Sequence, residues 1–123
     1  MTPLQILLLE DDNIFRNYIA QIAENNGFTL QSVSSAKAGL ELLKQKTYDL
    51  ILIAEHLPDM HGFSVTEIIR KQMELAATTP IILYTDKNGP KKQAEGLLLG
   101  ANSFLQKPFT EKQLLNEIET LML

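Results

Sequence analysis

Residues 47–62 read TYDLILIAEHLPDMHG, and this stretch decides the fold because its character changes halfway along. Leu50 to Ile53 form an apolar run of strand-forming residues, which is typical of a strand buried on both faces of a parallel sheet. The polar segment 55–62 then predicts a loop. In open α/β sheets the loops at the carboxyl ends of strands carry the functional site. The residue directly after the run, where a functional side chain is expected, is Ala54.

Apolar runs elsewhere predict four more strands, at 4–9, 30–33, 81–84 and 103–106. Helices are expected between and after the strands. The first helix shows the apolar stripe Ile14, Tyr18 and Ile22 and ends before Gly27, and the second follows Ser35 with the stripe Ala36, Leu40 and Leu43. The third and fourth are expected at 64–73 and 90–100, and Thr110 caps the last. Five strands alternating with five helices predict an α/β fold, a doubly wound (βα)5 parallel sheet covered on both faces.

Composition restricts the classes of function. The 123 residues have a net charge of −4, which disfavours a direct nucleic-acid partner, and they include no cysteine, which excludes disulfides and zinc–thiolate sites. The longest apolar runs are too short to cross a membrane, and the amino terminus MTPLQILLLEDD does not resemble a signal peptide. We expect a single cytoplasmic domain over 1–123, with no membrane partner.

Four predicted strand-end loops should meet at one edge of the sheet. They are Glu10-Asp11-Asp12, Ala54-Glu55-His56, Thr85-Asp86 and Lys107-Pro108. Clustered carboxylates suit Mg²⁺, whereas a hydroxyl and an ammonium group suit the oxygens of a phosphoryl group. Taken singly, the acids could equally cap a helix and the lysine or threonine could be a solvated residue. The hypothesis of a common site depends on their joint placement.

Over essentially its whole length the chain resembles the receiver domain of two-component response regulators. The residues that carry the resemblance are Glu10-Asp11, the frame from Asp49 through Leu57-Pro58-Asp59-Met60-His61-Gly62, Thr85, Gly100-Ala101-Asn102-Ser103-Phe104 and Lys107-Pro108-Phe109. The resemblance implies the flavodoxin-like strand order 2-1-3-4-5 and a signalling role without enzymatic activity of its own.

The resemblance also implies a metal site and a switch. Asp11 with Glu10 would hold Mg²⁺, and His56 would contribute its backbone carbonyl. Further roles fall on Thr85, which would follow the phosphoryl group, Lys107, which would pair with the phosphoryl oxygens, and Phe104, the aromatic switch. The Lys107–Pro108 bond is expected to be cis.

At the decisive position the chain departs from the family. The phosphoacceptor aspartate, four residues before Pro58, is Ala54 here. A methyl group cannot attack a phosphoryl donor, so phosphorylation by the usual route is not expected, and Mg²⁺ should bind weakly or not at all. Glu55 should point to the opposite face of the strand, which makes it a poor substitute, as is Asp59 further along the loop. We expect His56 and His61 to be exposed loop residues rather than a metal pair.

Two interpretations of Ala54 follow. The chain is either a natural pseudo-receiver that works by binding partners, or an active regulator in which alanine replaces the acceptor. Two other classes compete with both. A Mg²⁺-dependent phosphatase or phosphotransferase would need a nucleophilic aspartate at a strand end, and a flavodoxin-like cofactor binder would need a phosphate loop where this chain has acids.

Partner surfaces are predicted on two sides. Phe15 and Ile19 lie off the stripe of the first helix, so they either widen its buried face or dock a histidine kinase or phosphotransfer domain. The fourth helix, fifth strand and fifth helix resemble the family's output and dimerisation face. Lys91, Lys92 and Glu95 could form ion pairs there, in a homodimer or with an output domain.

Overall fold

A computed structural model describes residues 2–86 and 89–123. Its five strands are β1 (Gln5–Leu9), β2 (Thr29–Val33), β3 (Leu50–Ala54), β4 (Ile81–Thr85) and β5 (Ser103–Gln106). They form one parallel sheet in the order β2-β1-β3-β4-β5, which confirms the predicted fold class and strand order. The strand predictions were correct to within a residue or two at each end.

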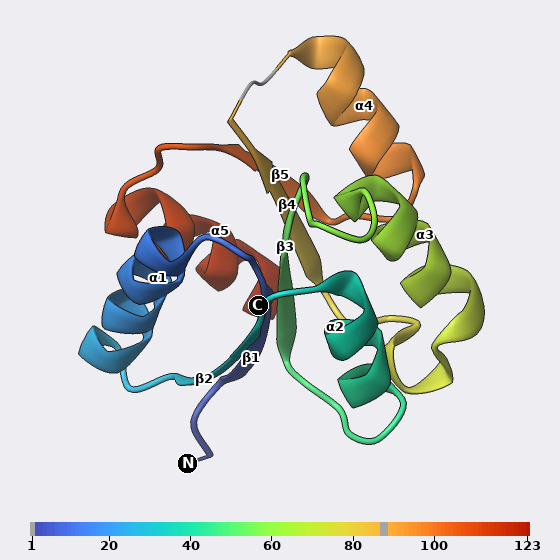
Figure 1. The fold of residues 1–123 in the computed structure, drawn as a ribbon. Coiled ribbons are helices and arrows are strands. Elements are labelled where there is room, and N and C mark those ends of the chain that lie inside the picture. The colour runs from blue at the N-terminus through green and yellow to red at the C-terminus, as the bar shows by residue number, and fades with distance from the viewer. Residues whose placement is uncertain (1, 87–88) are drawn as a thin grey trace.

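Five helices cover the sheet, and a short 3-10 turn, η1 (Glu74–Ala76), follows the third of them. The helices are α1 (Asn13–Asn25), α2 (Ala36–Leu43), α3 (Gly62–Gln72), α4 (Pro90–Leu98) and α5 (Glu111–Met122). Helices α1 and α5 lie on one face, and α2, α3 and α4 lie on the other (Figure 1). Within residues 2–86 and 89–123, no helix has the length and apolar character needed to span a membrane.

Helices α2 and α5 begin at their predicted caps, and α1 and α4 end just before their predicted glycines, whereas α3 begins at Gly62, before the predicted start at residue 64. The hydroxyl of Ser35 accepts from the N–H of Ala38, and Thr110 forms a reciprocal capping box with Gln113. Gly27, with φ of 70°, and Gly100, with φ of 119°, follow α1 and α4 in the left-handed region that glycine tolerates.

Strand alternation divides the core into two layers. Ile51 and Ile53 pack under α2 and α3, whereas Leu52 and Ala54 face α1 and α5. The register pairs Leu9 with Ile53 and Ala54 with Tyr84, which brings the carboxyl ends of β1, β3 and β4 side by side. The loops that leave these ends therefore meet over the edge of the sheet.

On α1 the sequence-based assignment of the buried face was wrong. Phe15 and Ile19 are core residues, 9% and 2% exposed, and so are not available as a docking surface. Ile14 is instead 81% exposed, and Tyr18 is 38% exposed. The true buried face is Phe15, Ile19 and Ile22, whose spacings of four and three follow the 3.6-residue helical period better than repeated spacings of four.

Candidate functional site

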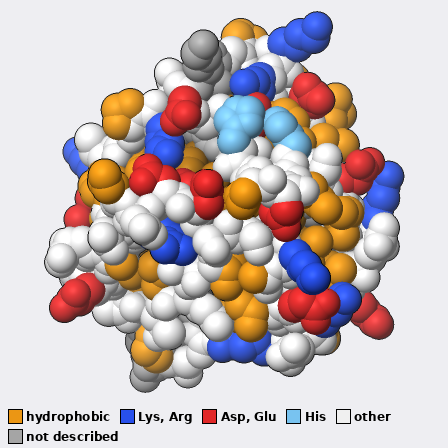
Figure 2. Space-filling model, in the orientation of Figure 1, with side chains coloured by type: hydrophobic (Ala, Val, Ile, Leu, Met, Phe, Trp, Pro, Cys, Tyr) orange, Lys and Arg blue, Asp and Glu red, His pale blue; other side chains and the backbone are white. Residues whose placement is uncertain are grey.

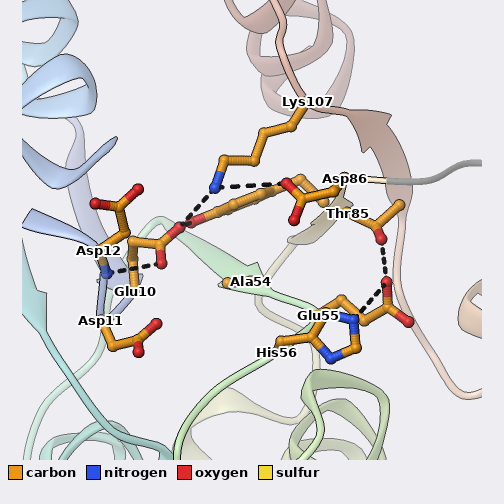
Figure 3. Close-up of a pocket in the computed structure, with 10 residues that line it drawn as sticks. Glu10, Asp11, Asp12, Ala54, Glu55, His56, Thr85, Asp86 and Lys107 are labelled. Carbon is orange, nitrogen blue, oxygen red and sulfur yellow. Dashed lines mark hydrogen bonds and ion pairs between the residues drawn. The ribbon is translucent and has the colours of Figure 1, made fainter. Parts of the chain in front are cut away.

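The four predicted strand-end loops form one pocket (Figure 3). It is lined by Glu10, Asp11, Asp12, Ala54, Glu55, His56, Tyr84, Thr85, Asp86 and Lys107. Every strand-end residue proposed from the sequence except Pro108 is among them. The joint placement inferred from the chain order therefore holds in three dimensions.

Glu10 is buried and fully engaged on the β1 side of the pocket. Its Oε1 accepts a 2.7 Å hydrogen bond from the Tyr84 hydroxyl and lies 3.6 Å from the Lys107 ammonium. Burial, followed by the negative charge of Glu10, raises the pKa of Tyr84 well above its usual value, so the phenol stays a proton donor to this carboxylate. Tyr84 was not predicted as a site residue.

The structure confirms the helix-capping interpretation of the acidic triplet for Asp12, whereas the metal-binding interpretation of Glu10 and Asp11 stays a prediction. Asp12 is the N-cap of α1, where its Oδ1 accepts from the N–H of Ile14 at 3.0 Å. Glu10 also accepts from the N–H of Asp12 at 3.1 Å, which fixes the loop. Asp11 is exposed at the pocket wall, where its carboxylate is accessible to a cation.

Lys107 lies across the pocket mouth. Its Nζ is 3.6 Å from Glu10, 3.8 Å from Asp86, and 4.1 Å from the centroid of the Phe15 ring. Lys107 is therefore a cation paired with two carboxylates and an aromatic ring, and its side chain is largely buried rather than solvated. The Lys107–Pro108 peptide bond is cis, as expected.

Ala54 ends β3 at the centre of the site, between the Glu10 side and the Thr85 side (Figure 3). Its side chain faces the α1 and α5 layer. A methyl group therefore stands at the centre of the pocket, with charged side chains on both sides.

Glu55 forms an unexpected charged network on the other side of Ala54. Its carboxylate is directed away from Glu10 and Asp11, as strand alternation predicted, but it is only 4% exposed and lies at the pocket rim (Figure 3). It accepts a hydrogen bond from the Thr85 hydroxyl and lies 3.0 Å from Lys92 Nζ.

Burial and the charged neighbours have opposite effects on the pKa of Glu55. Burial acts to raise the pKa, but hydrogen bonds from Thr85 and Lys92, together with the Lys92 charge, outweigh burial and lower it. Lys92, predicted as a partner-binding residue, forms an ion pair within the domain but keeps a partly exposed side chain, so its role in partner binding stays a prediction. Lys91 and Glu95 are exposed on α4, where their role in partner binding stays a prediction.

The structure confirms the predicted exposure of the two histidines, and that they do not form a metal pair stays a prediction. The side chains of His56 and His61 are 71% and 41% exposed. They nevertheless face each other across an isolated antiparallel bridge, with ring centroids 5.5 Å apart, and His61 Nε2 lies 3.1 Å from Glu55. The loop closes because the Gly62 N–H donates to the Glu55 carbonyl at 2.6 Å, a contact that no sequence pattern signals.

Phe104, the predicted aromatic switch, is buried beneath α4. Its ring packs edge-on against Phe63 at 6.0 Å, and it is not among the residues that line the pocket. Its switch role stays a prediction.

Asp59, which the sequence analysis expects to be a poor substitute acceptor, holds the start of α2. Its two carboxylate oxygens accept from the N–H groups of Ala36 and Lys37, each at 2.9 Å. The Lys37 and Ala36 hydrogen bonds lower the pKa of Asp59 below its usual 3.8. The ionised form is thus preferred in the folded state.

This lowered pKa sets the direction of a pH effect. The Asp59 carboxylate stabilises the fold above pH 3.8, and that contribution is lost as the pH falls through the lower folded-state pKa. We expect Asp59→Asn to lower the midpoint of urea unfolding at pH 7 and to reduce the loss of stability on acidification. Glu119→Gln, at an exposed carboxylate on α5, is the control. An unchanged acid profile for Asp59→Asn would contradict the assignment.

Comparisons with known proteins agree with this geometry. The family model described as the response regulator receiver domain matches residues 6–119. The cell cycle response regulators CtrA of Brucella ovis and Brucella abortus are 29% identical over 119 residues, which is 97% of this chain and 50% of each relative. The chain therefore spans about half the length of these curated relatives.

Solved structures share the fold along 98% of the chain. Chemotaxis response regulator CheY4 of Vibrio cholerae is 25% identical with a TM-score of 0.91, over 98% of this chain and 99% of that one. The receiver domain of a sensor histidine kinase from Pseudomonas aeruginosa PAO1, solved with magnesium in its active site cleft, is 27% identical with a TM-score of 0.89, over 98% of each chain. Together with the match over residues 6–119, this agreement shows that the chain belongs to the response regulator receiver domain family of two-component signalling.

Proposed function

We propose that this receiver domain signals by binding protein partners and does not accept a phosphoryl group at position 54. The observation that carries the proposal is the methyl group of Ala54 at the end of β3, beside Glu10 and Lys107. Phosphorylation of a receiver needs a carboxylate oxygen that attacks phosphorus, and alanine has no nucleophile.

The neighbouring carboxylate does not replace the missing one. Glu55 is turned toward Thr85 and Lys92, on the far side of Ala54 from Glu10 and Asp11. The hydrogen bond to Glu55 also holds the Thr85 hydroxyl, which is the group that the resemblance assigns to the phosphoryl oxygens. The resting domain thus already has a carboxylate bound to its switch threonine.

The acidic pocket is expected to bind Mg²⁺ only weakly. Glu10, Asp11 and the His56 carbonyl supply the oxygen ligands that Mg²⁺ prefers, so the donor types fit. Glu10, however, already accepts from Tyr84 and pairs with Lys107, and Ala54 removes one negative charge from the set. We expect weaker Mg²⁺ binding than in a receiver with an aspartate at this position.

The partners that fit are those of the family, a histidine kinase or phosphotransfer domain on one side and an output domain or second copy on the α4, β5 and α5 side. The exposed apolar side chains of α1 that could meet the first are Ile14 and Tyr18, not Phe15 and Ile19. A Mg²⁺-dependent phosphatase or phosphotransferase is the less favoured function, because the strand-end position that would hold its nucleophile is alanine.

The test is intact-mass measurement of the chain after incubation with Mg²⁺ and acetyl phosphate. We expect no phosphoryl adduct. An adduct that peptide mapping places on Glu55, and that Glu55→Gln abolishes, would overturn the proposal, as would an adduct on Asp59.

A further inference from the structure

Three potential metal ligands converge in the loop between β3 and α3. A carboxylate oxygen of Glu55, a ring nitrogen of His56 and a ring nitrogen of His61 all lie within 4.8 Å of one another. From Glu55, the Nε2 atoms of His56 and His61 are 3.7 Å and 3.1 Å away. The two imidazoles lie together on the molecular surface (Figure 2).

The loop backbone holds these residues in place. The bridge between His56 and His61 closes the loop, and the bond from Gly62 N–H to the Glu55 carbonyl tightens it. The His61 ring also packs edge-on against Phe63 at 4.8 Å. The arrangement therefore comes from the fold and does not depend on two free side chains meeting by chance.

We propose that Glu55, His56 and His61 form a binding site for Zn²⁺ or a similar nitrogen-preferring divalent cation, which borders the acidic Mg²⁺ pocket because Glu55 and His56 also line that pocket. Two imidazoles and one carboxylate, with a fourth position left for water, are a recurring ligand set for zinc. Donors around tetrahedral zinc lie about 3.3 Å apart, given bonds of about 2.0–2.1 Å. The His56 distance is measured from Glu55 Oε1 and the His61 distance from Oε2; both are already near this value, and the exposed His56 ring can turn to complete the set around one oxygen.

Zinc binding requires two existing contacts of the site to break, and each break can be measured. Lys92 Nζ, 3.0 Å from Glu55, must leave, and its partly exposed side chain can swing into water. His61 Nδ1 accepts from the Phe63 N–H at 3.2 Å, but a neutral ring bound through Nε2 carries its proton on Nδ1, so this cap must open. The site should thus bind less tightly than a closed structural zinc site, and Lys92 should oppose it.

Zinc would also act on the switch. Coordination draws electron density and a lone pair of the Glu55 carboxylate toward the metal, in competition with the hydrogen bond from the Thr85 hydroxyl. Occupancy of this surface site would therefore be sensed at the end of β4, without any phosphoryl group.

The experiment is a zinc titration of the untagged chain against a chromogenic chelator, with excess Mg²⁺ present to occupy the acidic pocket. We expect one equivalent to bind, His61→Gln and His56→Gln each to weaken binding about tenfold or more, and Lys92→Gln to tighten it. Lys71→Gln removes the same charge from an ion pair with Glu67 on α3 and is the matched control. Circular dichroism checks that each variant is folded.

An NMR titration gives a second readout that a nonspecific surface effect would not produce. The Phe63 amide resonance should shift on zinc addition, because the His61 cap opens. Equal affinity in the chain and in His61→Gln would overturn the site, and so would a Lys92→Gln effect no larger than that of Lys71→Gln. These outcomes are independent of whether the chain accepts a phosphoryl group.

Discussion

Replacing Ala54 with aspartate should convert the pocket into a phosphoryl acceptor. The new carboxylate would extend from the end of β3 on the α1 and α5 side, toward Glu10 and the Lys107 ammonium. One of its oxygens would form the bond to phosphorus as the bond to the acetate leaving group of acetyl phosphate breaks. Intact mass should show an adduct on most Ala54→Asp molecules and none on the unmodified chain.

Matched variants make this result specific. The asparagine of Ala54→Asn has nearly the same size as aspartate but no nucleophilic carboxylate, so this variant should remain unmodified.

Mg²⁺ should bind Ala54→Asp roughly tenfold or more tightly than the unmodified chain, because an added charge near the ion contributes a few kcal/mol at an effective dielectric constant of about 20. If Ala54→Asp takes no phosphoryl group, then Glu10, Lys107 and the other neighbours of position 54 do not support phosphoryl transfer, although the residue types are present.

The sequence predicted most of the fold because its signals are local and repeated. The run from Leu50 to Ile53, and its counterparts in the other strands, could only be buried between two helical layers. Capping residues such as Ser35 and Thr110 then placed helix starts to within about two residues. The meeting of four loops followed from chain order alone, since parallel strands end at one edge.

The face of α1 was misjudged because two overlapping apolar stripes compete in one helix. Ile14, Tyr18 and Ile22 repeat at spacings of four, which drifts around the helix by about 40° per step at 3.6 residues per turn. Tyr18 lies at the edge of the buried face, where its hydroxyl donates to the Phe109 carbonyl at 2.6 Å. Only the neighbouring sheet decides which stripe is covered.

The network around Glu55 could not be predicted because it depends on a turn and on long-range contacts. Lys92 comes from α4, 37 residues away, and Thr85 comes from β4. A buried carboxylate needs such partners, but the sequence does not say which groups supply them. Tyr84 illustrates a signal that was available, because a phenol in a fully buried strand requires a partner at the strand end.

Gly62→Ala should cause the largest loss of stability among the glycine variants that test this site. An added Cβ would lie 2.3 Å from the Ala54 carbonyl oxygen and 3.1 Å from the Glu55 Cα. Both are backbone atoms at the end of a central strand, so relief requires β3 and α3 to separate locally. We expect a loss of about 2–4 kcal/mol in the free energy of unfolding, measured by urea denaturation, at or above the usual range for overpacking.

Gly89→Ala is the informative control, because among the described residues beyond its chain neighbours no atom lies within 4 Å of the added Cβ. Gly89 has φ of −171°, an extended conformation open to alanine, and as N-cap of α4 it should lose at most about 1 kcal/mol. Equal effects of the two substitutions would show that the β3–α3 turn relaxes easily. A large effect confined to Gly62→Ala, accompanied by weaker zinc binding, would show that this close turn is what holds His56 and His61 against Glu55.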